Sequence, residues 1–223
     1  MGKKLCCILA VTVLSFFLSF NLKAQEDKFA LSAKAGTLGL GMEGTGRIND
    51  NLNYRLGVNA FQYDYDGTES DIKYDFDLEL LSFSALVDWF PFNNAFRLTA
   101  GALANENQLD LKAETTASYQ IGNVTYTAAQ VGTLNGSLDF DAICPYAGIG
   151  WGNPFGKDGG WSFAIDLGVM YQGSPDITLR TNGTLSANAA FLTELRREEN
   201  NLESDIEEFE FYPVISLAVT YRF

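Results

Sequence analysis

The feature that most constrains this chain is a strict alternation of apolar and polar residues in two long segments. Residues 161–171 carry Trp, Phe, Ile, Leu, Val and Tyr at every second position, with Ser, Ala, Asp, Gly and Met between them. Residues 209–223 alternate in a similar way and end at Phe223. A period of two is that of a β-strand, in which successive side chains point to opposite faces. Both segments are longer than an ordinary globular strand and long enough to cross a membrane at a tilt.

The first residues have the pattern of an export signal. Lys3 and Lys4 precede an apolar run over residues 5–20, and small Ala24 stands before Gln25 as at a cleavage site. The apolar run is shorter than the ~20 residues that a membrane-spanning helix needs, although a retained N-terminal anchor is the alternative. We therefore predict a signal peptide over residues 1–24 and a single mature domain over residues 25–223.

Composition excludes several classes of function. The chain has 15 Lys and Arg against 28 Asp and Glu, so nucleic-acid binding, which needs a basic patch, is not expected. It has no histidine, which removes the base of Ser-His-Asp hydrolases and the imidazole ligand of many zinc sites. Cys144 is the one cysteine beyond the predicted cleavage point, so no intramolecular disulfide is expected. We expect no enzymatic activity, cofactor or metal, a carboxylate-only enzyme being the remaining option.

The mature chain divides into further segments with the same period. We predict eight strands near residues 28–36, 38–48, 52–64, 72–90, 96–108, 138–152, 161–172 and 209–223. The fourth changes phase at Leu80-Leu81, which predicts a β-bulge.

The predicted connections alternate between short and long. Short, turn-rich connections cover residues 49–51, 91–95 and 153–160, and long polar ones cover 109–137 and 173–208. Outer-membrane barrels have short turns on the periplasmic side and long loops outside. The alternation therefore predicts a barrel with both termini in the periplasm.

With these features the sequence resembles the eight-stranded outer-membrane β-barrel proteins, the group that includes the outer membrane protein W type and the membrane domain of outer membrane protein A. The residues that carry the resemblance are the alternating strands, the segment Asp88-Trp89-Phe90-Pro91-Phe92 and the terminal Tyr221-Arg222-Phe223. The resemblance implies an all-β fold, a closed antiparallel up-and-down transmembrane barrel in the outer membrane. It also implies that Phe223 is the assembly signal read by the barrel-assembly machinery, and that outer-membrane lipids and lipopolysaccharide are partners.

Charged residues at inward positions of the predicted strands suggest a cluster in the lumen. Its predicted members are Asp75, Asp77, Glu79, Asp88, Asp166, Arg55, Arg97 and Arg222. Asp71 shares the strand-four face with the first three. Because the interior of an eight-stranded barrel is just wide enough for side chains, we expect the carboxylates to pair with the arginines. A cation-selective path or a divalent-ion site made of oxygen ligands is the alternative.

Aromatic residues predict where the barrel meets the two membrane interfaces, which Trp and Tyr prefer. A periplasmic girdle is predicted from Trp89, Trp151, Trp161, Tyr221 and Phe223. An opposite girdle is predicted from Tyr74, Phe76, Phe140, Tyr171 and Phe209.

The two long connections contain local structure of their own. Residues 189–208 place Leu and Ile at helical spacing among many Glu residues, which predicts a short amphipathic helix at the barrel mouth in the last long loop. Residues 119–126, with Gly122-Asn123 at their centre, predict a hairpin.

Three functions are compatible with these predictions. The first is a structural, envelope-stabilising or surface-interaction protein that acts through its long extracellular loops. The second is a narrow, porin-like conduit for small apolar or cationic solutes. The third is a soluble ligand-binding barrel in the periplasm.

Overall fold

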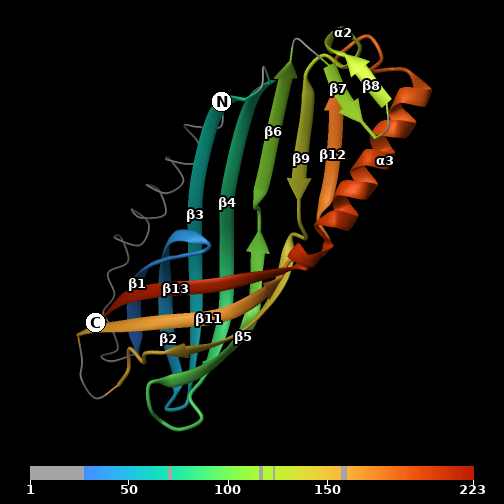
Figure 1. Ribbon diagram of the computed structural model, residues 1–223. Coiled ribbons are helices and arrows are strands. Elements are labelled where there is room, and N and C mark those ends of the chain that lie inside the picture. The colour runs from blue at the N-terminus through green and yellow to red at the C-terminus, as the bar shows by residue number, and fades with distance from the viewer. Residues whose placement is uncertain (1–27, 70–71, 116–117, 123, 157–159) are drawn as a thin grey trace.

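Eight strands close into an antiparallel barrel in the computed structural model, which describes residues 28–69, 72–115, 118–122, 124–156 and 160–223 (Figure 1). In order around the barrel, the strands are β1 (Phe29–Gly36), β2 (Gly39–Asn49), β3 (Leu52–Glu69), β4 (Ile72–Trp89), β5 (Phe96–Asn105), β10 (Ile143–Trp151), β11 (Trp161–Tyr171) and β13 (Phe211–Arg222). Strand β13 pairs with β1 from Ala30–Arg222 to Gly36–Ser216, which closes the sheet. The predicted eight-stranded barrel is confirmed, whereas the predicted signal peptide and Asp71 lie outside the described residues.

On one side of the barrel, two of its strands extend beyond the rim into a sheet with three further strands, and we call these five strands the head sheet. Its order is β3, β4, β6 (Gln108–Thr115), β9 (Leu134–Asp139) and β12 (Asp176–Thr181). Strand β4 pairs with β5 along its barrel half and with β6 along its head half, in one continuous register. The wall formed by β1, β2 and β13 does not rise with it, so the head stands over one side of the barrel (Figure 1).

The head sheet carries a hairpin and a helix at its far edge. The hairpin consists of β7 (Ser118–Ile121) and β8 (Val124–Thr127), followed by α2 (Ala128–Val131); α3 (Ala189–Asp205) and the 3-10 turn η1 (Glu207–Glu210) precede β13. A buried cluster joins hairpin and helix, and consists of Tyr119, Ile121, Val131, Phe191 and Leu195. The predicted hairpin and helix are therefore confirmed.

Helix α3 lies along the free edge of β12, and this position corrects the expectation that it caps the barrel mouth. Its Glu199 Oε1 accepts the backbone N–H of Leu179 at 2.7 Å, and its Glu203 Oε1 accepts that of Ile177 at 3.0 Å. These carboxylates take the place of a neighbouring strand, because an uncovered edge strand leaves its N–H groups unpaired.

The β-bulge predicted at Leu80-Leu81 is absent from β4. Its register with β3 runs without interruption from Leu52–Trp89 to Glu69–Ile72. The environment of the strand changes at this point. Odd-numbered residues after Leu81 lie on the outer surface of the barrel, whereas odd-numbered residues before it lie on the same face of the head sheet and include carboxylates. The apolar pattern therefore switches phase although the strand stays regular.

Among the described residues, no helix is both long enough and apolar enough to cross a membrane.

Candidate functional site

The lumen contains a network of buried ion pairs with Arg55 of β3 at its centre. The Arg55 guanidinium approaches three carboxylates from three other strands, with N–O distances of 3.1 Å to Glu43, 2.8 Å to Asp88 and 3.3 Å to Asp166. All four side chains are buried. A guanidinium has five N–H donors in a fixed plane, so it can serve three carboxylates and keep donors for a further partner.

A second arginine completes the network. Arg97 of β5 lies 2.8 Å from Asp166 and 3.6 Å from Asp88, and it also donates to the carbonyl of Gly152. Thr99 donates its hydroxyl to Asp88 at 2.7 Å.

Lys34 of β1 closes the network on its remaining side, 3.1 Å from Glu43. We call the six charged groups the lumen network: Lys34, Glu43, Arg55, Asp88, Arg97 and Asp166. Three cations face three anions in this network, so it carries no net charge.

Alternation along the strands explains which residues reach the network. Arg55 lies between Tyr54 and Leu56, both exposed on the outer surface, and Asp166 lies between the exposed Ile165 and Leu167. Because successive side chains point to opposite faces, these charged residues must point inward. The structure thus brings together four predicted residues, Arg55, Asp88, Arg97 and Asp166.

Lys34, Glu43 and Thr99 were missed in the sequence analysis. Glu43 lies in the glycine-rich strand β2, where Gly41, Gly44 and Gly46 obscure the alternation. The exposed Leu40 and the half-buried Met42 would have marked Glu43 as an inward residue.

Three of the predicted lumen carboxylates are elsewhere, and this part of the prediction is wrong. Asp75, Asp77 and Glu79 occupy the head half of β4, on the face that continues the outer surface of the barrel. Asp75 lies 3.5 Å from Lys73 and 3.7 Å from Lys112, all of them partly exposed. The error follows from the uninterrupted register of β4, because a bulge would have turned these residues toward the lumen.

Arg222, another predicted member of the lumen cluster, lies outside the lumen network. It is partly buried near the short-turn end of the barrel, where its Nη1 donates to the carbonyl of Gly156 at 3.1 Å.

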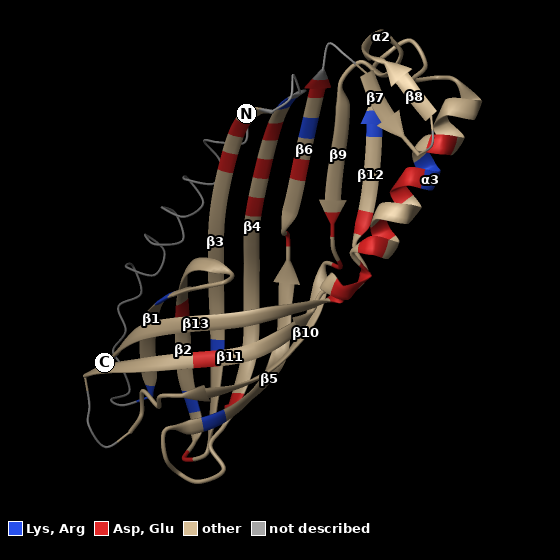
Figure 2. Ribbon diagram, viewed as in Figure 1, with Lys and Arg blue, Asp and Glu red and all other residues tan. Residues whose placement is uncertain are grey.

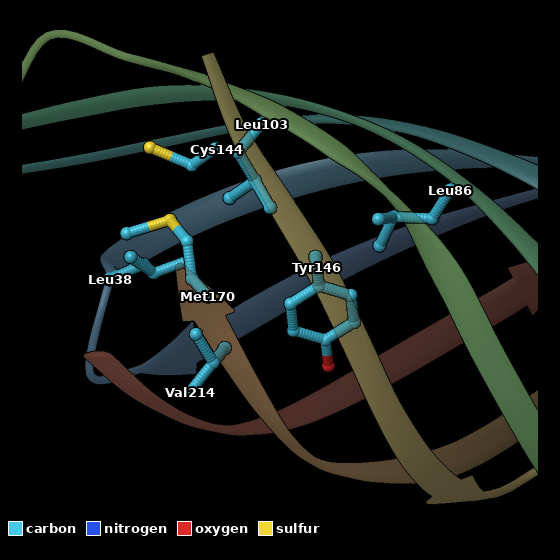
Figure 3. Close-up of a cluster of buried hydrophobic side chains, with 7 residues drawn as sticks. All are labelled: Leu38, Leu86, Leu103, Cys144, Tyr146, Met170 and Val214. Atoms are coloured by element: carbon cyan, nitrogen blue, oxygen red, sulfur yellow. The ribbon is translucent and has the colours of Figure 1, made fainter. Parts of the chain in front are cut away.

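An apolar layer fills the lumen on the head side of the lumen network. It consists of Leu38, Leu86, Leu103, Cys144, Tyr146, Met170 and Val214, all buried. Figure 3 shows these side chains converging from the surrounding strands on the middle of the barrel. A solute coming from the head would meet this layer before it reached the charged groups.

Little open space remains between the two layers. A cavity of about 20 Å³ is bordered by Arg55, Asp166, Leu86 and Tyr146, among others. A water molecule needs roughly 10–15 Å³ of such space, so the cavity has room for about one. A wider cavity of about 530 Å³ lies at the short-turn end, between Arg47, Asn94 and neighbouring turn residues. The cavity between the lumen network and the apolar layer therefore has no room for a solute larger than water.

Five aromatic side chains lie exposed on the outer surface at the short-turn end of the barrel. They are the residues of the predicted first girdle: Trp89, Trp151, Trp161, Tyr221 and Phe223. The rings of Trp161 and Tyr221 are 5.0 Å apart, and those of Tyr221 and Phe223 are 5.3 Å apart. Such a band is typical of the place where a membrane barrel meets the head-group region.

The second predicted girdle is partly wrong. Tyr74 and Phe76 point to the same face of β4 as Asp88, so they lie on the inner face of the head sheet. Tyr171 and Phe209 are exposed, and Phe140 is half-buried in the link between β9 and β10. The ring of Tyr171 packs against that of Phe211 in a tilted arrangement, with centroids 5.3 Å apart, at the head end of the outer surface.

We predict that the three tryptophans lie at one membrane interface. Three variants each keep one of Trp89, Trp151 and Trp161 and have Phe in place of the other two. Lipids brominated near their head groups should quench the fluorescence of each remaining tryptophan more strongly than lipids brominated near the bilayer centre. All three should also respond alike to an aqueous quencher added on one side of oriented vesicles. A tryptophan quenched from the opposite side, or only at the bilayer centre, would contradict this arrangement.

The head carries most of the negative charge of the protein (Figure 2). Residues 61–81, 106–142 and 172–210 contain 21 of the 28 acidic and 5 of the 15 basic residues, a net charge of −16 against +3 for the remainder. The outer face of the head sheet even places Asp77 opposite both Asp64 and Asp110, and like charges at such positions are destabilising.

Some of this charge is paired on the same face. Lys112 and Glu114 lie 2.9 Å apart, and their hydrogen bond lowers the pKa of the Glu114 carboxyl and raises that of the Lys112 ammonium. Within the described part of the chain, no group of three or more Cys, Asp or Glu side chains is arranged to hold a metal ion.

Comparison with solved structures settles the class of the fold. Acinetobacter baumannii CarO2 superposes with a TM-score of 0.59, at 24% identity over 90% of this chain and 100% of that one. Acinetobacter baumannii CarO superposes with a TM-score of 0.54, at 22% identity over 87% of this chain and 97% of that one. The chain has the fold of the eight-stranded outer-membrane β-barrels. No protein-family model matches the sequence, and no curated protein sequence matches it.

Because the sequence identity to these barrels is below one quarter, the structural similarity establishes the fold alone. The function has to be argued from the geometry of this chain. The barrel surface carries exposed Leu, Ile, Val, Phe and Trp side chains, and its interior holds the lumen network. A soluble ligand-binding barrel would have the reverse arrangement.

Proposed function

We propose that this protein is a sealed outer-membrane barrel that anchors an acidic head at the cell surface, where it stabilises the envelope and binds partners. The observation that carries the proposal is the presence of two successive side-chain layers in the lumen. A neutral network of six charged groups is followed by seven apolar side chains, and a cavity of about 20 Å³ lies beside them.

The energetics of the lumen network support a permanent closure. Removing one partner of a buried ion pair typically costs about 3–5 kcal/mol, because the other charge is left buried without compensation. A solute crossing this lumen would have to separate several such pairs and displace the apolar layer as well. Opening this path would therefore leave buried charges without compensation, which opposes the passage of a solute.

The proposed surroundings follow from the surface of the barrel. Its exposed apolar side chains would contact lipid, lipopolysaccharide would surround the head, and the barrel-assembly machinery would insert the exported chain. The head would lie outside the cell, because short turns of outer-membrane barrels face the periplasm. We propose no enzymatic role and no cofactor, since the lumen network consists of charges that neutralise one another.

Planar-bilayer recordings on the purified protein test the proposal. We expect no stepwise conductance at moderate voltage, whereas an open porin in the same membrane gives clear steps and serves as the control. Regular conductance steps from the wild-type protein would favour the narrow conduit for small apolar or cationic solutes, because the lumen would then have to open. Retention of the protein in the inner-membrane fraction would contradict its location.

A further inference from the structure

One edge of the head sheet has no neighbouring strand among the described residues. Strand β3 pairs with β2 only up to Ala60, opposite Leu40, because β2 begins at Gly39. Beyond that point, residues 61–69 pair with β4 alone among the described residues. The backbone groups on the other side of this segment form the kind of edge to which another strand can add. We call residues 61–68 the β3 edge.

The opposite edge of the same sheet, along β12, is covered by a helix. Along β12, the carboxylates of Glu199 and Glu203 accept the N–H groups of Leu179 and Ile177, and α3 covers the strand. Within the described part of the chain, the sheet thus has one edge blocked by its own helix and one edge without such a cover. This contrast indicates that the β3 edge is available to a partner.

The side chains along the β3 edge alternate between aromatic residues on one face and polar or acidic residues on the other. Phe61, Tyr63 and Tyr65 point to the inner face of the head sheet and are 44%, 50% and 55% exposed. Asp64 and Asp66 point to the outer face, where both are also exposed. An added strand places its own side chains opposite these, so it must be apolar on one face and basic on the other to match.

A second copy of this chain fits the β3 edge poorly. When two such edges pair, outer-face residues meet outer-face residues. Each register that pairs nearly all of residues 61–68 places at least one carboxylate of Asp64 or Asp66 opposite a carboxylate of the other copy. Like charges directly opposite each other destabilise a sheet. The net charge of −16 on each head adds long-range repulsion between copies.

We infer that the β3 edge is a docking site for an extended segment of another protein in which basic and apolar residues alternate. The partner's backbone continues the head sheet beyond β3, above the turn between β1 and β2. Its apolar side chains pack beside Phe61, Tyr63 and Tyr65, and its Lys or Arg side chains lie near Asp64 and Asp66. The inference rests on the proposed function for its biological setting, because the head must face outward to meet such a partner.

Titration with defined peptides tests the inference. The protein, purified from the outer membrane and placed in zwitterionic lipid nanodiscs, is mixed with an eight-residue peptide of alternating Lys and Val, blocked at both ends. We expect saturable binding, together with slower hydrogen exchange at residues 61–68. A peptide of the same composition with its Lys and Val in two blocks should bind more weakly, and a Glu-Val peptide should not bind.

A matched pair of variants separates local recognition from general attraction. Replacing Asp64 and Asp66 by Asn should weaken binding of the Lys-Val peptide by roughly 2- to 30-fold, the range expected for two lost cross-strand charge pairs. Replacing Asp139 and Asp176 by Asn removes the same charge from the outer face of β9 and β12 and should have little effect. These residues lie about 14 Å or more from the β3 edge, beyond the screening length at physiological salt.

N-methylation of the Lys-Val peptide at alternate residues, made in both phases, distinguishes strand addition from other binding. Each methyl group removes one backbone donor, so at least one of the two phases must abolish binding if the peptide pairs with β3. Full binding by both methylated peptides, equal binding of the Glu-Val peptide, or unchanged exchange at residues 61–68 would overturn the inference. A dimer held through β3 would also overturn it. None of these readouts depends on conductance, so the inference and the proposed function can fail separately.

Discussion

Replacing Arg55 by Met is expected to lower the free energy of unfolding by about 3–5 kcal/mol. Met preserves much of the apolar stem of Arg55 and removes the guanidinium that serves Glu43, Asp88 and Asp166. Three buried carboxylates would then share Lys34 and Arg97, and one negative charge would have no partner. Urea titration of the folded protein in lipid vesicles, followed by tryptophan fluorescence, measures the loss.

Two further variants make this result specific. Arg180→Met removes an exposed arginine from β12 of the head and should change the free energy of unfolding by less than about 1 kcal/mol. Adding Asp88→Asn to Arg55→Met should restore part of the lost stability, because it removes the excess negative charge. Equal stability of Arg55→Met and Arg180→Met would show that the lumen network does not stabilise the barrel.

Deleting Phe223 is expected to cause a large loss of correctly assembled protein in the outer membrane. Its backbone N–H bonds to the carbonyl of Phe29 at 3.3 Å, at the junction where β13 meets β1, and its ring packs 5.3 Å from that of Tyr221. Loss of this residue removes both the terminal aromatic group that the barrel-assembly machinery is expected to read and a contact at the closing seam. The fraction that migrates as the compact form in unheated detergent gels measures assembly.

The control for this deletion removes a larger part of the head. Replacing the hairpin residues 118–127 by a short Gly-Ser linker deletes β7 and β8, which belong to the head and not to the barrel. Such a variant should still insert, although its head should become less stable because the buried cluster around Tyr119 and Phe191 is lost. Normal outer-membrane levels without Phe223 would refute its role as the assembly signal.

The position of Glu43 shows where the sequence analysis was limited. The amino-acid pattern identifies inward residues only where outward neighbours are clearly apolar, as around Arg55 and Asp166. In β2 the glycines have no side chains to reveal a face, so Leu40 and Met42 were the only signal for Glu43, and its contact with Lys34 emerged only from the pairing of β1 with β2. In that register Ser32 lies opposite Glu43, and Lys34 lies opposite Gly41. Lys34 is therefore two residues from the position opposite Glu43 on the same face, and its ammonium reaches the Glu43 carboxylate.

The sequence by itself determined the barrel, the inward set of Arg55, Asp88, Arg97 and Asp166, and the aromatic band at the short turns. It did so because a strand has a period of exactly two residues in its side-chain directions, so each long alternating segment fixes its own two faces. Only the tertiary structure decided where the barrel wall ends and the head begins. Asp75, Asp77 and Glu79 share the outer face of β4 with Phe83 and Trp89, yet they have β6 as a neighbour rather than β5. Alternation distinguishes one face from the other, but it cannot say which medium each face meets, because that depends on strands distant in the sequence.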